Sequence, residues 1–194
     1  KGDVGARFLP FDLSSFKYST ATGFTRADQE ASFKALNKAI IDDTNPSVAM
    51  GVLIPGWYGG ATFPNSTFDD TFVPDEPNGP GGGWTASPTL YKQVTAKYCR
   101  GCHITRDGFL AWDEFANFQS GGSLIKFDVC KGRAMPQAKV TYINFWTDTA
   151  ARGLLESAGL SGWSLGDPCP SGPPYSMRPT EYVDVADAST MTTS

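Results

Sequence analysis

One short stretch, Cys99-Arg100-Gly101-Cys102-His103, restricts what this chain can fold into more than any other. The two cysteines are three residues apart, so on a helix they lie on the same face, and a histidine follows at once. The chain has 194 residues and four cysteines, but His103 is its only histidine. We therefore expect the fold to place this imidazole and both thiols around one site.

The C-x-x-C-H spacing is the attachment pattern for c-type haem. At this spacing, Cys99 and Cys102 can each add to one vinyl group of a haem, and His103 can bind the iron as the proximal ligand. Gly101 leaves room for the edge of the macrocycle, and Arg100 is expected to point outward. The motif thus predicts one covalently bound haem c as the cofactor.

Three other interpretations of the motif stay open. A redox dithiol of thioredoxin type would need a strand-to-helix setting, whereas this motif follows an amphipathic helix. A zinc site would combine Cys99, Cys102 and His103 with Cys130 or Cys169, but the second pair of cysteines lacks tight spacing. In the third interpretation the two thiols are buried and structural, and the histidine is incidental.

The second axial ligand of a haem iron would have to come from a residue other than histidine. Met135 is followed by Pro136, in an irregular stretch before the last expected helix. Proline fixes the backbone, so this loop can present the sulfur of Met135 toward the iron. Of the other methionines, Met50 is expected in the core, while Met177 and Met191 lie in the tail.

The pattern of apolar residues predicts a mainly α protein. Helices are expected over residues about 25–43, from Ser87-Pro88 to the cysteine motif, within 107–118, and over 141–158 with an interruption near 147–149. A long loop rich in Gly, Pro, Asn and Asp is expected over 55–87. No apolar run reaches the roughly 18 residues of a transmembrane helix.

Residues about 88–158 resemble a class I c-type cytochrome, because a helix, C-R-G-C-H, a short helix, A-M-P and a final helix follow in that order. C-R-x-C-H followed by M-P-x-A-x-V-T-x-x-x-F-W is also similar to a group of secreted bacterial monohaem cytochromes. This similarity extends to R-F-L-P-F-D and T-R-A-D-Q-E near the N-terminus. The resemblance implies thioether bonds at Cys99 and Cys102, with His103 as the proximal ligand and Met135 as the distal ligand.

The fold implied is a cytochrome c-like helical domain around one haem, with a long, loop-rich N-terminal extension. We expect the extension over 1–84, with one helix at about 25–43, the haem domain over 85–169 and an extended tail over 170–194. Aromatic residues near the motif are candidate walls of the haem pocket, although each also suits a plain core. These are Tyr98, Phe109, Trp112, Phe127, Tyr142, Phe145 and Trp146.

Cys130 and Cys169 are not haem ligands in the family that the chain resembles. In an oxidising compartment they would form a disulfide, and closing a loop of about 40 residues would contribute roughly 3–4 kcal/mol. Two free thiols are the alternative. The chain begins Lys1-Gly2-Asp3 without Met, which is typical of a mature product after removal of a targeting segment. Covalent haem attachment and the expected disulfide both favour a periplasmic or extracellular location.

Charge is unevenly distributed, although the net charge is −4. Residues 88–140 hold eight Lys or Arg against four Asp or Glu, so the region around the motif is basic. It offers a docking face for an acidic redox partner, or groups that pair with haem propionates. The candidate residues are Lys92, Lys97, Arg100, Arg106, Lys131 and Lys139. Nucleic-acid binding is not expected, because the basic residues are dispersed and the chain is acidic overall.

The function that these features predict is single-electron transfer by a monohaem cytochrome, not enzymatic catalysis. Two alternatives belong to other classes. If Met135 does not bind iron, the protein is a haem enzyme or a ligand-binding haem protein, although no second histidine can serve as a distal acid or base. Alternatively, its long loops and tail make it a haem-bearing structural subunit of a larger complex or filament.

Overall fold

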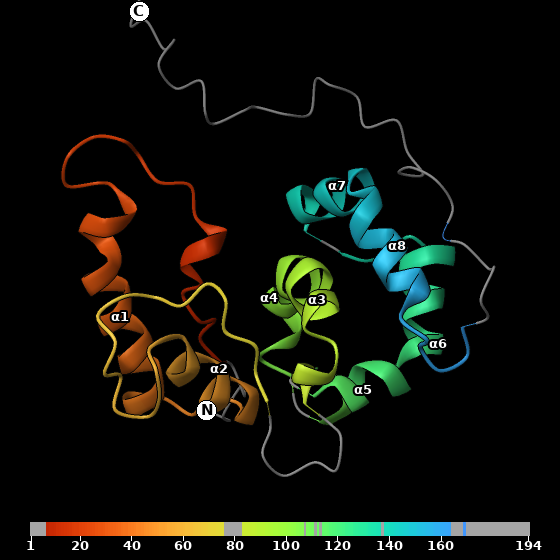
Figure 1. The fold of residues 1–194 in the computed structure, drawn as a ribbon, viewed down its shortest axis with the longest axis horizontal. Helices are drawn as coiled ribbons and strands as arrows, with labels where there is room; N and C mark the ends of the chain where they lie inside the picture. The colour runs from red at the N-terminus through yellow and green to blue at the C-terminus, as the bar shows by residue number, and fades with distance from the viewer. Residues whose placement is uncertain are drawn as a thin grey trace, which may run out of the picture.

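The computed structural model describes residues 7–75, 83–106, 108–110, 112, 114–136, 138–163 and 169, with the backbone alone at Phe109 and Lys139. Across these residues the chain is mainly helical and has no β-strand, which confirms the expected α class. Figure 1 shows the helices of the N-terminal part gathered on one side and the later helices on the other. The expected tail over 170–194 lies outside the described residues.

The N-terminal part has three helical elements. In chain order they are η1 (Leu13–Ser15, a 3-10 helix), α1 (Arg26–Asp43) and α2 (Val48–Trp57). α1 begins with a capping box, because Thr25 accepts from the Asp28 N–H and the Asp28 carboxylate accepts from the Thr25 N–H. Its bounds agree with the helix expected over about 25–43.

α2 contradicts the expectation of a single helix in this part of the chain. Ser47 caps it by accepting from the N–H of Met50, and Pro55 lies in its last turn. Its sequence, V-A-M-G-V-L-I-P-G-W, is apolar all round, as is typical of a buried helix. It therefore lacks the polar stripe by which a surface helix is recognised. Met50 is fully buried in it, in the core as predicted.

Eleven buried side chains form a cluster that we call the N-terminal core. They are Leu13, Ile40, Ala49, Met50, Leu53, Ile54, Trp57, Tyr58, Phe63, Phe68 and Ile104. A fully buried amide, that of Asn37, lies among them. It accepts from the Phe11 N–H at 2.8 Å and donates to the Phe11 carbonyl at 2.9 Å and to the Tyr58 hydroxyl at 3.3 Å. Both ends of the amide are thus satisfied, which removes the cost of burying it.

The rest of the described chain contributes ten further helical elements. They are η2 (Trp84–Ala86), α3 (Pro88–Leu90), η3 (Tyr91–Cys99), α4 (Arg100–His103), η4 (Gly108–Leu110), α5 (Phe115–Ser120), α6 (Gly122–Ile125), η5 (Lys126–Lys131), α7 (Lys139–Thr147) and α8 (Thr149–Ser157). α7 and α8 meet at Asp148, where the sequence predicts an interruption. Asp148 caps α8 by accepting from the Ala151 N–H at 3.0 Å.

α3, η3 and α4 follow one another without a break, so a single helical run carries the cysteine motif, as expected. The middle stretch, η3, is π-helical, and the Arg100 N–H bonds to the carbonyl of Thr95, five residues back. Such turns are rare and occur mostly as short bulges, often at functional sites. Here the run ends at the motif itself, with Cys99 closing η3 and His103 closing α4.

α6 and η5 form a helical stretch that the sequence did not reveal. Gly121 ends α5 as expected, but Gly122 begins α6 directly. A Cβ at Gly122 would lie 2.4 Å from the carbonyl oxygen of Ser161 and 2.6 Å from Leu160 Cβ. Gly122 is therefore required by close packing against the segment after α8, not by a turn.

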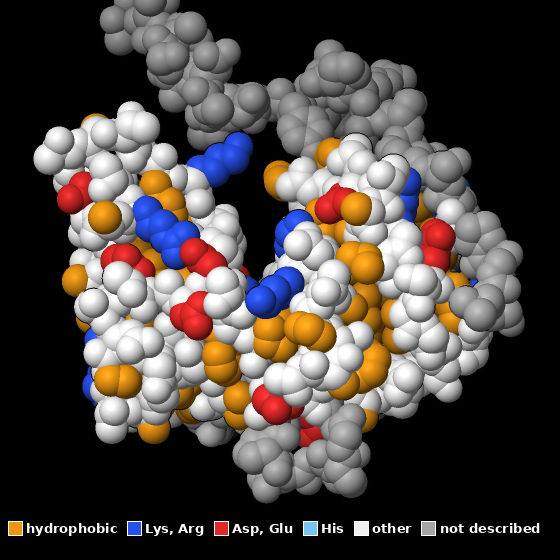
Figure 2. All heavy atoms as spheres, in the orientation of Figure 1, with side chains coloured by type: hydrophobic (Ala, Val, Ile, Leu, Met, Phe, Trp, Pro, Cys, Tyr) orange, Lys and Arg blue, Asp and Glu red, His pale blue; other side chains and the backbone are white. Residues whose placement is uncertain are grey.

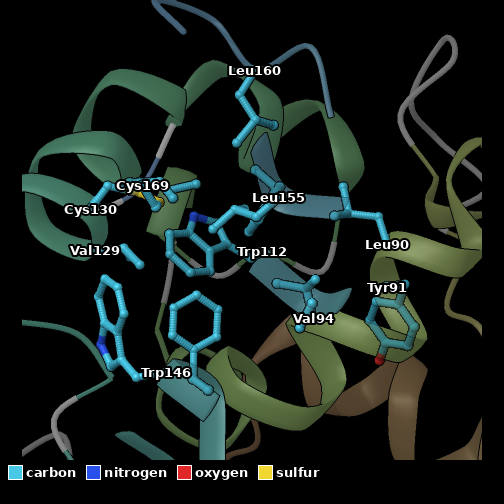
Figure 3. Packing of buried hydrophobic residues seen from close by; sticks show 14 of the residues in the cluster. Leu90, Tyr91, Val94, Trp112, Val129, Cys130, Trp146, Leu155, Leu160 and Cys169 are labelled. Atoms are coloured by element: carbon cyan, nitrogen blue, oxygen red, sulfur yellow. A yellow bond between two sulfur atoms is a disulfide. The ribbon is translucent and has the colours of Figure 1, made fainter. Parts of the chain in front are cut away.

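A second cluster, which we call the C-terminal core, joins these helices (Figure 3). Its buried members are Trp84, Leu90, Tyr91, Val94, Trp112, Phe118, Ile125, Val129, Cys130, Tyr142, Phe145, Trp146, Ala151, Leu155, Leu160 and Cys169. The two cores contain different parts of the chain, apart from Ile104, which follows the motif but packs in the N-terminal core. The domain boundary expected at about residue 84 stays a prediction.

Polar contacts join the N-terminal part to the segment of the cysteine motif. The Ser47 hydroxyl donates to the Ile104 carbonyl at 2.5 Å, and Arg7 donates to the Thr105 carbonyl at 2.8 Å. Arg100 forms an ion pair with Asp12 in which both side chains are largely buried, 11 % and 16 % exposed. The N-terminal part therefore covers one side of the motif.

Candidate functional site

A cavity of about 310 Å³ lies inside the C-terminal core, next to the cysteine motif. Its volume falls at the lower end of the range for small-molecule and cofactor pockets, about 300–1,000 Å³. The residues that line it are Val94, Tyr98, Cys99, Cys102, His103, Arg106, Leu110, Trp112, Phe118, Leu124, Ile125, Asp128, Val129, Met135, Pro136, Phe145 and Leu155. It thus brings together both motif cysteines, the single histidine and Met135, which the sequence predicts to meet.

Cys99 and Cys102 face this cavity from the end of the helical run. Both are free thiols; Cys99 is half-buried and Cys102 is exposed. Burial, followed by the neighbouring Cys102, raises the pKa of Cys99 to about 12. At neutral pH Cys99 is therefore a protonated thiol, whereas the reactive cysteine of a redox dithiol has a lowered pKa. The raised pKa of Cys99 does not favour the dithiol interpretation.

The ring of His103 is held on two sides. Its Nδ1 lies 2.8 Å from the carbonyl oxygen of Leu110, so Nδ1 carries the proton that is donated there and Nε2 has a free lone pair. The ring also stacks on Trp112, with centroids 3.6 Å apart and planes 7° apart. Burial lowers the pKa of His103, which favours the neutral imidazole. A neutral ring with one nitrogen fixed by a backbone carbonyl is the form that binds a metal.

Met135 reaches the cavity from the loop that follows η5. The Asp128 carbonyl accepts from the N–H groups of Ala134 at 2.8 Å and Met135 at 3.3 Å, so the loop folds back on the end of η5. Pro136 lines the cavity beside Met135. Met135 is half-buried and packs against the C-terminal core. Its thioether is thus placed in the same cavity as the imidazole of His103.

Three of the predicted wall residues, Tyr98, Trp112 and Phe145, line the cavity. Tyr98 packs edge-on against Phe145, with ring centroids 5.3 Å apart, and its hydroxyl donates to the Asp148 carboxylate at 2.7 Å. Desolvation, followed by this hydrogen bond, raises the pKa of Tyr98. Tyr98 therefore stays neutral and presents its ring, not a charge, to the cavity.

The remaining aromatic candidates are not seen at the cavity. Trp146 and Tyr142 are buried in the C-terminal core but do not line the cavity. Phe127 is 62 % exposed, so its proposed role as a wall is wrong. The side chain of Phe109 lies outside the described part of the structure.

Sequence reasoning missed the aliphatic part of the wall. Val94 precedes Tyr98 by four residues, and Ile125 precedes Val129 by four residues, so each pair lies on one face of its helical stretch. Leu155 enters from α8 and Phe118 from α5. The helical spacing of Val94 could be recognised in the sequence. That of Ile125 and Val129 could not, because Gly121 and Gly122 stand at the start of the helical stretch that carries them.

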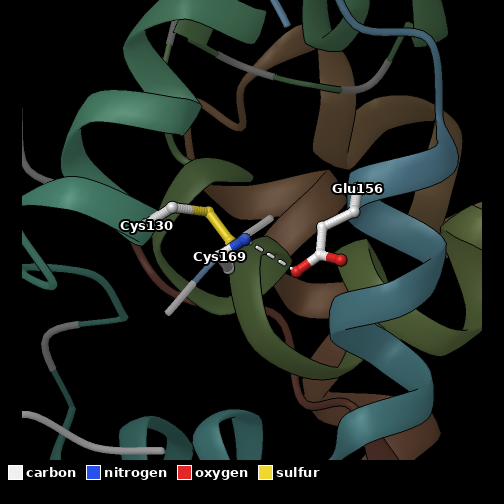
Figure 4. Close-up of a disulfide and its surroundings, with 3 residues drawn as sticks. All are labelled: Cys130, Glu156 and Cys169. Atoms are coloured by element: carbon white, nitrogen blue, oxygen red, sulfur yellow. Dashed lines mark hydrogen bonds between the residues drawn. A yellow bond between two sulfur atoms is a disulfide. The ribbon is translucent and has the colours of Figure 1, made fainter. Parts of the chain in front are cut away.

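Cys130 and Cys169 are joined by a disulfide, the pair expected from the sequence (Figure 4). Cys130 belongs to η5, five residues before Met135, and Cys169 follows the last helix. The N–H of Cys169 donates to the Glu156 carboxylate of α8 at 2.8 Å. The zinc interpretation required Cys130 or Cys169 as a fourth ligand. Because the disulfide joins these two cysteines, neither is a free thiolate for zinc. Moreover, the described residues contain no group of three or more His, Cys, Asp and Glu that could hold a metal.

The proposed basic face needs one correction. Arg100 does not point outward: it pairs with Asp12, donates to the Tyr91 hydroxyl at 3.0 Å and lies over Trp57 at 5.3 Å. Burial alone would lower the pKa of Arg100, but Tyr91 and Asp12 outweigh it and the pKa is raised. The N-terminal part, which the sequence could not place, provides all of these partners except Tyr91.

The other basic candidates that the structure describes remain available at the surface. Lys92, Lys97, Arg106 and Lys131 are exposed, and the side chain of Lys139 lies outside the described part. On the face shown in Figure 2, Lys and Arg side chains are scattered, not gathered in one patch. None of the helices that the structure describes is long and apolar enough to cross a membrane.

The donor set of the cavity fits haem c. It combines two thiols three residues apart, an imidazole with a free Nε2 and a thioether, all within mainly apolar walls. Arg106 lines the cavity as a cation, and the buried Trp112 N–H has no hydrogen-bond partner among the described residues. Both are donors for carboxylates such as haem propionates. No protein-family model, curated protein or solved structure matches the chain.

Proposed function

We propose that the protein is an exported monohaem c-type cytochrome that carries single electrons between redox partners. One observation carries the proposal: the cavity of about 310 Å³ brings Met135 together with Cys99, Cys102 and His103, more than 30 residues earlier in the chain. Neither a dithiol nor a structural pair of cysteines requires a thioether and an oriented imidazole in the same cavity.

In this proposal the chain supplies every attachment point of the cofactor. Cys99 and Cys102 hold haem c through thioether bonds, Nε2 of His103 is the proximal ligand and the sulfur of Met135 is the distal ligand. The haem supplies the one-electron chemistry, by cycling between the ferrous and ferric states. Thioether ligation favours the ferrous state and raises the reduction potential.

The surrounding residues keep both axial ligands in place during electron transfer. The Leu110 carbonyl fixes the orientation of the His103 ring, and the Asp128 carbonyl fixes the Met135 loop. The apolar walls, among them Val94, Phe118 and Leu155, exclude water from the site. Little has to rearrange when the charge changes, which suits an electron carrier better than an enzyme.

Location and partners follow from the same proposal. A disulfide between Cys130 and Cys169 and covalently attached haem both suit an oxidising compartment outside the cytoplasm. Redox partners with an acidic surface would dock on the exposed residues Lys92, Lys97, Arg106 and Lys131.

The proposal is tested by optical spectra of the protein exported from a host that attaches haem c. We expect a low-spin ferrous spectrum and, in the ferric form, the weak far-red band of thioether-to-iron charge transfer. In Met135→Ala this band disappears while the covalent haem remains. Val140→Ala is the control, because Val140 is 62 % exposed and does not line the cavity.

Two outcomes contradict the proposal. A high-spin ferric spectrum that shifts with cyanide or carbon monoxide would indicate an open sixth position, and hence a ligand-binding or catalytic haem protein. Protein without covalent haem, from a host that attaches haem to a control cytochrome, would rule out both haem functions.

A further inference from the structure

Trp146 lies away from the cavity, yet its ring carries two guanidinium contacts. The Cζ atom of Arg133 lies 5.5 Å from the ring centroid and that of Arg152 lies 5.7 Å from it. Guanidinium groups within about 6 Å of an aromatic ring are attracted by its π electrons, most strongly when the ring is an indole. Trp146 is 1 % exposed, so water competes little with either contact.

Arg133 is the residue that connects this ring to the functional site. It belongs to the Met135 loop and precedes Met135 by two residues. Its φ of +49° lies in the left-handed region, which disfavours side chains other than glycine. Such a conformation persists only where the surroundings hold it. The contact with Trp146 on one side and the hydrogen bonds of Ala134 and Met135 to Asp128 on the other provide that hold.

Arg152 contacts the same ring from a different element. It lies on α8 and also donates to the carbonyl of Trp146, so it joins α8 to the end of α7. The two guanidiniums therefore have different roles, and Arg152 offers a matched control for Arg133.

The indole N–H of Trp146 has no hydrogen-bond partner in the part of the chain that the structure describes. The ring is therefore held by packing and by the two guanidiniums, not by its own N–H. A phenylalanine at this position would preserve an aromatic ring for Arg133, whereas a leucine would not.

We propose that Arg133 and Trp146 are positioning residues that fix the Met135 loop and so set how firmly the sulfur of Met135 holds the sixth position of the haem iron. This inference rests on the proposed function. It assigns Trp146 a task in the site without contact with the cofactor, and it explains why an arginine occupies a left-handed position where glycine would be less strained.

The test measures how readily imidazole displaces Met135 in the ferric protein. Imidazole binds only when Met135 has left the iron, so its apparent affinity rises with the population of the dissociated form. We expect Arg133→Gly to increase the apparent imidazole affinity at least tenfold, although glycine relieves the backbone strain and preserves the fold. Trp146→Leu should act in the same direction, while Trp146→Phe and Arg152→Ala should stay within about twofold of the wild type.

A second readout does not involve the iron. The amide N–H of Met135 donates to the Asp128 carbonyl, so a looser loop exposes it more often. Its hydrogen exchange should be faster in Arg133→Gly and unchanged in Arg152→Ala. Arg133→Lys, which keeps a cation over Trp146, should recover part of the wild-type behaviour in both measurements.

The outcomes separate this inference from the function on which it rests. Wild-type protein without the far-red band overturns the proposed ligation, and this inference with it. Wild-type protein with the band, but with equal imidazole affinity in Arg133→Gly, Arg152→Ala and the wild type, overturns this inference alone. Equal effects of Arg133→Gly and Arg152→Ala would also overturn it, because Trp146 would then act only through the general stability of the core.

Discussion

The two cores of the molecule differ in how completely they are filled. In the N-terminal core, the one fully buried amide, Asn37, has all of its hydrogen bonds satisfied, and the Ser47 hydroxyl is also bonded. The C-terminal core surrounds a cavity of about 310 Å³, and the described residues leave Thr95 Oγ1 and the indole N–H groups of Trp112 and Trp146 without partners. A concave, mainly apolar pocket of this size is typical of a ligand site.

This difference is what the proposed function requires of the two parts. A core that is packed and satisfied by its own side chains serves as a support, and the N-terminal part supports the motif through Asp12 and Ser47. A core that borders a pocket lined by thiols, an imidazole and a thioether suits the binding of a cofactor. In the proposed function, the stability of the first core is therefore intrinsic, while that of the second depends on the haem.

The largest expected effect is on the C-terminal core. It tests whether the stability of that core, unlike that of the N-terminal core, depends on the haem. Cys99→Ser/Cys102→Ser should prevent haem attachment and lower the free energy of unfolding of that core by at least about 4 kcal/mol, the stabilisation by a ligand at about a thousand times its dissociation constant. Hydrogen exchange should show lost protection in α7 and α8 but retained protection in α1 and α2. Equal loss in both parts would mean that the two cores unfold as one.

Removal of the disulfide acts on the same core without touching the thiols of the cavity. Cys130→Ser/Cys169→Ser opens a loop with a sequence separation of 39. We expect a loss of about 3–4 kcal/mol on the chain-entropy model, with covalent haem still attached. Urea denaturation followed by haem absorbance measures this. A loss of haem attachment in this variant would show that the disulfide is needed to form the site.

A cavity made in the N-terminal core should have a purely structural effect. Ile54 is fully buried in α2, and Ile54→Ala should cost about 3 kcal/mol, within the usual 2–5 kcal/mol. The haem spectrum of the folded protein should stay unchanged. Val48→Ala in the same helix is the matched control, because Val48 is 72 % exposed. A loss of the far-red band in Ile54→Ala would contradict the account in which the N-terminal core supports the motif but takes no part in the ligation of the haem iron.

The smallest effect concerns acid stability, because each part has a carboxylate at a helix N-terminus whose pKa is lowered by hydrogen bonds. The Ala151 N–H and then the Tyr98 hydroxyl lower the pKa of Asp148; the Thr25 hydroxyl and backbone lower that of Asp28. Each carboxylate stabilises the fold fully above the unfolded-state pKa of about 3.9. This stabilisation is lost as the pH falls through the lower folded-state pKa.

Each carboxylate should therefore affect only its own core below about pH 4. In Asp148→Asn the C-terminal core should lose stability less steeply there than in the wild type, and in Asp28→Asn the same should hold for the N-terminal core. Hydrogen exchange between pH 3 and 6 distinguishes the two. Identical profiles in the wild type and Asp148→Asn would show that this carboxylate does not contribute to acid unfolding.

The sequence predicted which chemically distinctive side chains come together better than it predicted the apolar walls around them. Spacing alone identified Cys99, Cys102 and His103, and the proline after Met135 marked its loop. All four line one cavity. These signals are local and chemically specific, because few residue types can bind haem. The helices at 26–43 and 88–103 were recognisable because their caps and apolar spacing are also local signals.

What the sequence did not reveal depends on contacts between distant segments. α2 is apolar on all sides, so periodicity could not mark it as a helix. Gly122 allows close approach to Leu160 and Ser161, a role that no local pattern in the sequence indicates. Arg100 was expected at the surface, because its partner Asp12 lies 88 residues away in the chain. Such pairings are set by the fold as a whole.

The most direct test of the account is the mass of the intact protein, exported from a host that attaches haem c. The account predicts a gain equal to one haem over the polypeptide mass, lost in Cys99→Ser/Cys102→Ser and retained in Met135→Ala and Trp146→Leu. After trypsin cleavage, the haem should join a peptide of residues 98–100 through Cys99 to a peptide of residues 101–106 through Cys102. A polypeptide mass without haem, from a host that loads a control cytochrome, would contradict the claim that this cavity holds covalent haem.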